Sequence, residues 1–146
     1  MATDANKAVI RRLFAEVFNA GDVDAVAALA APDVLGHDAT SPEPRRGLES
    51  VRQVAVLFRT AFPDLRLGVE DLVAEGDKVV ARWTLRGTHR GTFMGIPATG
   101  KVATTAGIVV YRLAGGKIVE YWGSFDALGL MRQLGAIPDS TERAGS

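Results

Sequence analysis

Four long runs of β-type residues fill the second half of the chain and limit its fold more than any other feature. They span residues 66–74, 78–86, 102–113 and 117–125. Each run is rich in the β-branched and aromatic residues that favour strands. Turns at Glu75-Gly76-Asp77 and Ala114-Gly115-Gly116 separate two pairs of these runs, and we therefore expect two β-hairpins. A sheet of long antiparallel strands is the predicted centre of the fold.

The first half of the chain has helical periodicity instead. Apolar residues recur at helical spacing through residues 5–18 and 48–62, where Pro63 ends the second pattern. A short helix should begin after Asp22, an expected N-cap, and a closing helix should occupy residues 127–134. Residues 33–39 should be extended. Helices followed by a run of strands predict the α+β class, with helices packed on one face of a bent sheet.

Length and composition indicate one soluble domain at residues 1–137, with a flexible tail at residues 138–146. The chain has 146 residues, of which 47% are hydrophobic and 23% charged. Seventeen basic residues balance 17 acidic ones, so we expect neither a nucleic-acid nor a membrane partner. The absence of cysteine excludes a thiolate nucleophile. Neither a signal-peptide layout nor a membrane-spanning run is present, so the cytoplasm is the expected compartment.

Polar residues on two predicted strands are the first candidates for a site. Successive side chains of a strand point to opposite faces, and this alternation groups Glu120, Trp122 and Asp126 on one face. If helices cover one face of the sheet, Arg82, Glu120 and Asp126 are candidates for polar groups in a cavity. From the residues alone, the favoured interpretation of Arg82 and Glu120 is a solvated outer face or a structural ion pair. Asp126 fits a helix N-cap, because it lies between the last strand and the closing helix.

The two histidines and the glycine-rich segment match no common catalytic motif. His37 and His89 are far apart in the chain and lack clustered carboxylates, so we predict no metal site. Residues 87–100, GTHRGTFMGIPATG, fit neither a phosphate loop nor a dinucleotide fingerprint. The segment joins two strands, so no helix N-terminus follows it to bind an anion. We expect His89 to be structural.

The same glycine-rich segment resembles a motif of the SnoaL-like polyketide cyclases, a family that shares the fold of nuclear transport factor 2 and ketosteroid isomerase. Matching stretches elsewhere are VVARWT at residues 79–84, GKIVEYW at 116–122 and His37-Asp38 followed by RGLE at 46–49. The resemblance spans roughly residues 9–135. Ala98 departs from it, because proline is expected there before Thr-Gly.

The resemblance implies a cone-shaped α+β barrel, in which a curved antiparallel sheet wraps around a pocket closed by N-terminal helices. It implies a lyase or isomerase that performs an aldol-type ring closure or isomerisation of a small hydrophobic carbonyl compound, with no metal or cofactor. Asp126 matches the general acid/base aspartate of the family, and His37 matches a histidine near the pocket. Relatives commonly form homodimers or higher homo-oligomers through the convex sheet face, which here would carry Val119, Tyr121 and Phe125.

Acid/base chemistry of this kind needs a group that removes a proton beside a carbonyl and returns one to the forming alkoxide. On that expectation, Asp126 would move the proton, and His37 would stabilise enolate charge through a hydrogen bond. The walls of the pocket and its polar groups should contact the substrate. The predicted substrate-binding residues are Arg82, Trp122, Glu120, Phe18, Phe58, Phe14, Trp83, Phe93 and Met94.

Two other functions stay open on the sequence. An epoxide hydrolase or dehydratase on the same fold needs an acid and a base around one water, which Arg82, Asp126 and Glu120 would supply in part. A non-catalytic domain that binds a small molecule would use Asp126 only as a helix cap.

Overall fold

The computed structural model describes residues 2–38 and 41–137, so the tail predicted at residues 138–146 lies outside the described residues. The N-terminal helix α1 (Ala2–Arg12) continues as a π-helical segment (Leu13–Asn19), and a 3-10 turn (Val23–Ala25) leads into α2 (Val26–Leu29). The remaining elements are β1 (Ala30–His37), β2 (Arg45–Arg46), α3 (Leu48–Ala61), β3 (Arg66–Glu75), β4 (Lys78–Thr88), β5 (Val102–Ala114), β6 (Lys117–Phe125) and α4 (Ala127–Gln133).

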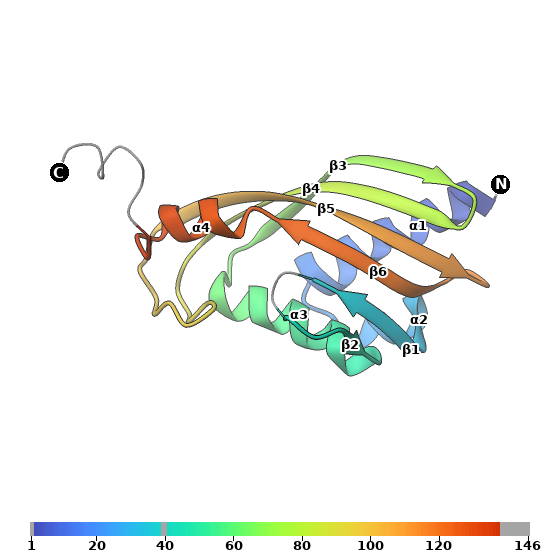
Figure 1. Ribbon diagram of the computed structural model, residues 1–146, viewed down its shortest axis with the longest axis horizontal. Helices are drawn as coiled ribbons and strands as arrows, with labels where there is room; N and C mark the ends of the chain where they lie inside the picture. Colours follow the sequence, from blue (N-terminus) through green and yellow to red (C-terminus); the bar gives the residue numbers. More distant parts are fainter. Residues whose placement is uncertain (1, 39–40, 138–146) are drawn as a thin grey trace.

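Six strands form one curved, open sheet in the order β2-β1-β6-β5-β4-β3. Strands β3 to β6 are antiparallel, and the two predicted hairpin turns are confirmed. Gly76, Gly115 and Gly116 adopt positive φ in those turns, a conformation that glycine accepts without steric cost. Strand β1 pairs in parallel with β6, which extends the sheet beyond the hairpins. The predicted α+β class is confirmed, and Figure 1 shows the sheet lying over the helices.

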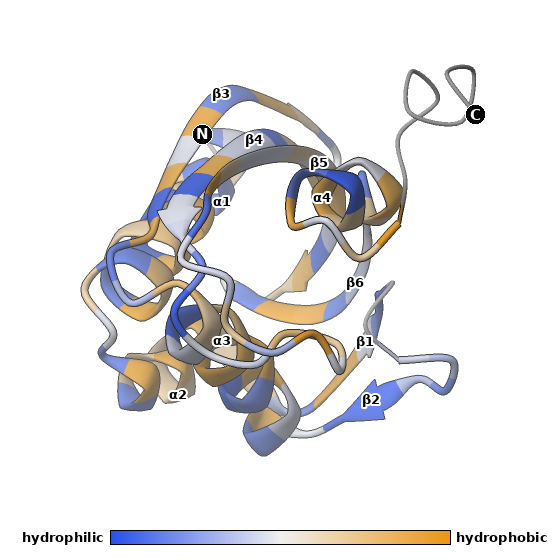
Figure 2. Cartoon of the chain, turned by 90° about the vertical axis from the view of Figure 1, so that its left-hand side faces the viewer, coloured by the Kyte–Doolittle hydropathy of each residue, from blue (hydrophilic) through white to orange (hydrophobic). Residues whose placement is uncertain are grey.

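The N-terminal helices and α3 pack on the concave side of the sheet. Viewed end-on, the strands form an arc, and helices α1, α2 and α3 lie on its open side (Figure 2). The core between them is apolar: Ile10, Val17 and Phe62 are fully buried. Among the described residues, no helix combines the length and apolar character required to cross a membrane.

Two local features differ from the predicted helices. The first helix changes to π-helical geometry at Leu13, and π-helical turns are rare and often occur at functional sites. Asp22 occupies the predicted N-cap position, but its side chain makes no capping hydrogen bond. The closing helix α4 does have a side-chain cap, supplied by Asp126.

Candidate functional site

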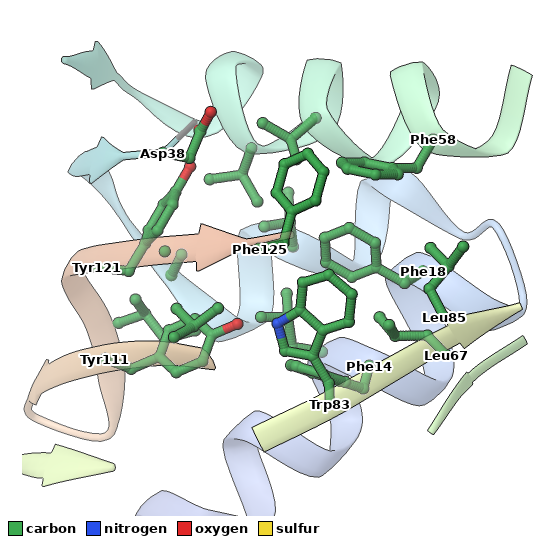
Figure 3. A pocket seen from close by; sticks show the side chains of 18 of the residues that line it. Phe14, Phe18, Asp38, Phe58, Leu67, Trp83, Leu85, Tyr111, Tyr121 and Phe125 are labelled. Carbon is green, nitrogen blue, oxygen red and sulfur yellow. The ribbon is translucent and has the colours of Figure 1, made fainter. Parts of the chain in front are cut away.

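A pocket lies between the concave face of the sheet and the helices (Figure 3). Its free volume is about 100 Å³, below the roughly 300–1,000 Å³ usual for ligand pockets. A substrate of ordinary size therefore requires the lining side chains to move. Nineteen residues line the pocket: Leu13, Phe14, Phe18, Val26, Ala30, Asp38, Val51, Val54, Phe58, Leu67, Trp83, Leu85, Val109, Tyr111, Ile118, Tyr121, Gly123, Ser124 and Phe125.

Aromatic rings form the largest part of the pocket wall. Phe14 and Phe18 come from the π-helical segment, with ring centroids 6.1 Å apart. Phe125 stands edge-on to Phe58 of α3 at 5.7 Å and lies 6.3 Å from Trp83 of β4. Four of the predicted substrate-binding residues (Phe14, Phe18, Phe58 and Trp83) therefore line this pocket. Their contact with a ligand stays a prediction.

Glycines in the sheet make room for two of the large rings. A Cβ atom at Gly107 would collide with the indole ring of Trp83, and one at Gly36 would collide with the phenol ring of Tyr121. Neither glycine has a positive φ, so close approach of a ring, not backbone conformation, is the reason for glycine there.

The polar groups of the pocket gather at its β1–β6 end. Asp38 directly follows β1, and its Oδ2 lies 3.2 Å from Nε of Arg45 in β2. Both side chains are largely buried, at 13% and 18% exposure. Tyr121 of β6 lies beside Asp38, while the hydroxyl of Tyr111 points toward the middle of the pocket (Figure 3). The pocket thus combines an apolar wall with one carboxylate, two phenols and Ser124.

Burial keeps both phenols protonated. Burial and, to a smaller extent, the nearby Asp38 carboxylate raise the pKa of Tyr121 to about 12, while Arg45 partly opposes the shift. Burial also raises the pKa of Tyr111 well above its usual value. Near neutral pH, both hydroxyls are therefore hydrogen-bond donors.

The predicted assignment of faces in β6 is wrong beyond Ile118. Arg112 pairs with Glu120 and Leu113 with Ile118, so Val119 is an extra residue that forms a β-bulge. A bulge reverses the alternation of side chains that follow it. Tyr121, Gly123 and Phe125 consequently line the pocket, and Trp122 is 38% exposed on the opposite face. Tyr121 and Phe125 are therefore absent from the convex face, where a dimer contact was expected; a homodimer itself stays a prediction.

His37 and Glu120 come together, but outside the residues that line the pocket. Nε2 of His37 lies 3.0 Å from Oε2 of Glu120, and the His37 ring stacks on Trp122 with centroids 5.7 Å apart. Arg112 donates a hydrogen bond to the other Glu120 oxygen at 3.2 Å. The bond from His37, and to a smaller extent Arg112, holds the pKa of Glu120 below its usual value, although burial opposes the shift. Trp122, Glu120 and His37 form a cluster on the convex face.

Arg82 also points away from the pocket. Its Nε donates a hydrogen bond to Oδ2 of Asp71 at 2.7 Å, in an exposed pair between β3 and β4. Arg82 therefore pairs with Asp71, and not with Glu120 or Asp126, the two carboxylates considered with it as candidates for a polar group in a cavity. The arginine and two carboxylates that an epoxide hydrolase would need around one water do not lie together in the pocket.

Asp126 lies outside the pocket lining and caps α4. Its Oδ1 accepts a hydrogen bond from the Gly129 backbone N–H at 2.8 Å, and the residue is exposed. The structure thus places Asp126 where the residue type alone predicted it, at a helix N-cap. The catalytic role implied by the resemblance stays an untested prediction.

The GTHRGTFMGIPATG segment connects β4 and β5 and supports the wall from behind. Phe93 is fully buried against Phe58, with ring centroids 5.3 Å apart, but does not line the pocket. Met94 is 38% exposed at φ 48°, also away from the pocket. His89 is fully buried, and its Nδ1 accepts a hydrogen bond from the Thr99 backbone N–H at 3.2 Å. The predicted structural role of His89 is confirmed.

The polar pocket residues that sequence reasoning left out of the site are Asp38, Tyr111, Tyr121 and Ser124. Asp38 was visible as the neighbour of His37 in the matched stretch. Within a strand, adjacent residues face opposite sides, so His37 on the convex face places Asp38 toward the pocket. Tyr111 shares the inward parity of the buried Leu113 in β5. No local signal identifies Tyr121, because its orientation depends on the bulge at Val119.

Comparison with known proteins agrees with this architecture. A model of the SnoaL-like polyketide cyclase family matches residues 8–134. The aklanonic acid methyl ester cyclase DauD of Streptomyces sp. (strain C5) is 32% identical over 130 residues, which cover 87% of this chain and 80% of the relative.

Two solved structures illustrate the range of proteins with this fold. A protein of Jannaschia sp. CCS1, assigned as a SnoaL-like polyketide cyclase, is 28% identical and superposes with a TM-score of 0.85. The match covers 93% of this chain and 95% of the Jannaschia chain. AclR of Streptomyces galilaeus, assigned as a hydroxylase, is also 28% identical and superposes with a TM-score of 0.84. The match covers 97% of this chain and 88% of the AclR chain. Similar backbones therefore carry different assigned reactions.

Proposed function

The chain belongs to the SnoaL-like polyketide cyclase family, and on that premise we propose that it closes a ring in a small apolar carbonyl compound by cofactor-free acid/base chemistry. The observation that carries this proposal is the position of Asp38. Among the described residues, Asp38 is the one carboxylate that lines the apolar pocket. A general base must reach the proton that it removes, and Asp38 lines the pocket whereas Asp126 lies outside its lining.

The surroundings of Asp38 support its use as a base. The ion pair with Arg45 holds the Asp38 carboxylate in place at the edge of the pocket. The aromatic wall matches an apolar substrate body. In an aldol closure, Asp38 would take a proton from a carbon beside a carbonyl. The resulting enolate carbon would attack a second carbonyl of the same molecule, and the new alkoxide would recover the proton from Asp38.

A matched pair of variants tests this proposal. We expect the wild type to cyclise linear β-polyketone methyl esters, and liquid chromatography measures the rate at which the cyclic product forms. Asp38→Asn should lower this rate by about 10²–10⁴-fold. Asp126→Asn should retain the wild-type rate, because that side chain lies outside the pocket. Both variants remove one carboxylate charge, so a difference between their cyclisation rates reflects whether the lost carboxylate lines the pocket.

The opposite result has a clear meaning. A large loss in Asp126→Asn with a retained rate in Asp38→Asn would return the acid/base role to Asp126. Binding of such esters without any product would favour the non-catalytic alternative.

A further inference from the structure

The pocket holds a buried phenol for which the described part of the chain provides no hydrogen-bond partner. Tyr121 is 9% exposed, and among the described residues its hydroxyl oxygen is buried without a hydrogen-bond partner. A buried hydroxyl that loses its bonds to water destabilises the fold unless something replaces them. Because Tyr121 lines the pocket, a ligand in that pocket can supply the missing acceptor.

We propose that Tyr121 donates a hydrogen bond to one carbonyl oxygen of the ligand, the oxygen that becomes an enolate when Asp38 removes the neighbouring proton. The catalytic part of this assignment rests on the proposed function. The binding part does not, because it requires only a ligand with a carbonyl acceptor on an apolar body.

The sheet fixes the Tyr121 ring in this position. Gly36 of β1 pairs with Tyr121 of β6, and the absent Cβ at position 36 leaves the space that the ring fills. Asp38 lies two residues beyond Gly36 on the same side of the chain. A Cβ atom at Gly123 would lie 3.9 Å from the Cβ of Asp38, which places Asp38 beside the second residue after Tyr121. The phenol and the carboxylate therefore occupy the same end of the pocket (Figure 3).

The charges at this end suit the two roles. Tyr121 keeps its proton because burial and the Asp38 carboxylate raise its pKa to about 12. It therefore acts as a neutral donor beside a charged base. A hydrogen bond to an oxygen strengthens as negative charge develops on that oxygen, so the contact favours the enolate over the ketone.

The proton and the electrons of this step balance within the pocket. The C–H bond breaks, its proton moves to Asp38, and the electron pair moves to the carbonyl oxygen that accepts from Tyr121. When the enolate carbon forms the new C–C bond, the ketone is restored and the attacked oxygen takes the proton from Asp38. Tyr121 keeps its own proton throughout.

Binding of two matched ligands tests the donor without relying on turnover. Acetophenone carries a carbonyl oxygen where α-methylstyrene has a CH₂ group, and the two are otherwise alike in shape. We expect Tyr121→Phe to weaken acetophenone binding by about three- to tenfold while α-methylstyrene binding stays unchanged, measured by titration calorimetry on the full chain. Tyr111→Phe, which removes the other pocket hydroxyl, is the matched control.

An infrared measurement on the wild type gives a second reading that does not depend on any variant. The C=O stretch of bound acetophenone should lie at lower frequency than in an apolar solvent, and Tyr121→Phe should remove this shift. An unshifted band in the wild type overturns the proposal. So does equal loss of both ligands in a folded Tyr121→Phe protein. If the wild type cyclises none of the polyketone esters but shows the shifted band, the donor assignment survives and the proposed reaction does not.

Discussion

The Tyr121 ring of β6 lies directly over Gly36 of β1, in the space that a Cβ atom at position 36 would fill. The two strands pair in parallel, so this contact joins the edge of the sheet that carries Asp38 to the strand that carries the phenol. The polar end of the pocket therefore depends on a residue without a side chain.

Replacing Gly36 with alanine should disturb this end of the pocket. The new methyl group cannot coexist with the present ring position, so Tyr121 must move or the strands must separate. Overpacking of this kind costs about 1–3 kcal/mol in the free energy of unfolding. We expect Gly36→Ala to lower that free energy in urea denaturation and to weaken acetophenone binding as Tyr121→Phe does.

Gly123 provides the control for this substitution. A Cβ atom there would lie 3.5 Å from Cγ2 of Val109, an ordinary contact, although Gly123 lines the same pocket. Gly123→Ala should therefore leave the unfolding free energy nearly unchanged. Equal destabilisation by both alanines would show that the packing of Tyr121 on Gly36 is not the cause.

The elements of this fold could be predicted from the sequence, but the contents of the pocket could be predicted only in part. Strand limits followed from local signals, because residue type and glycine turns mark where a hairpin begins and ends. Helical periodicity placed Phe14, Phe18 and Phe58 on apolar helix faces, and the family resemblance implied the pocket that these rings line. These signals lie within one element and need no knowledge of its neighbours.

The polar side of the pocket depends on pairing between strands, which the sequence does not display. The bulge at Val119 arises where β6 meets β5, and it reverses the faces of Tyr121 and Trp122. Strict alternation along β6 therefore predicted Glu120 and Trp122 as pocket residues, although both lie on the convex face. Asp38 reaches the pocket because β1 pairs with β6, a contact between residues far apart in the chain.

Loss of the cap on α4 should affect stability and leave the pocket intact. Asp126 accepts from the Gly129 N–H at 2.8 Å, and replacing a capping side chain with alanine typically costs about 1 kcal/mol. We expect Asp126→Ala to lower the unfolding free energy by about that amount, measured by urea denaturation, while Asp126→Asn retains most of it. Acetophenone affinity should match the wild type in both variants, and a lower affinity in both would place Asp126 in the binding site after all.

Acid should weaken the convex-face cluster of His37, Glu120 and Trp122. Hydrogen bonds from His37 and, to a smaller extent, Arg112 hold the pKa of Glu120 below its usual value of 4.5 in the folded protein. A carboxyl group with a depressed folded pKa contributes stability that is fully present above its unfolded pKa and lost as pH falls through its folded pKa. The contribution of Glu120 should therefore decline below about pH 5, as the carboxylate begins to take up protons.

Denaturation midpoints in urea at about pH 6 and about pH 3.5 test this contribution, since the ordinary pKa of a glutamate carboxyl group, which applies in the unfolded chain, lies between the two values. We expect Glu120→Gln to lose less stability between the two pH values than the wild type, because glutamine does not titrate. Glu75→Gln, at an exposed position at the end of β3, should lose as much as the wild type. If Glu120→Gln shows the full wild-type loss, the acid sensitivity belongs to other carboxyl groups with lowered pKa values, such as Asp64 and Glu16.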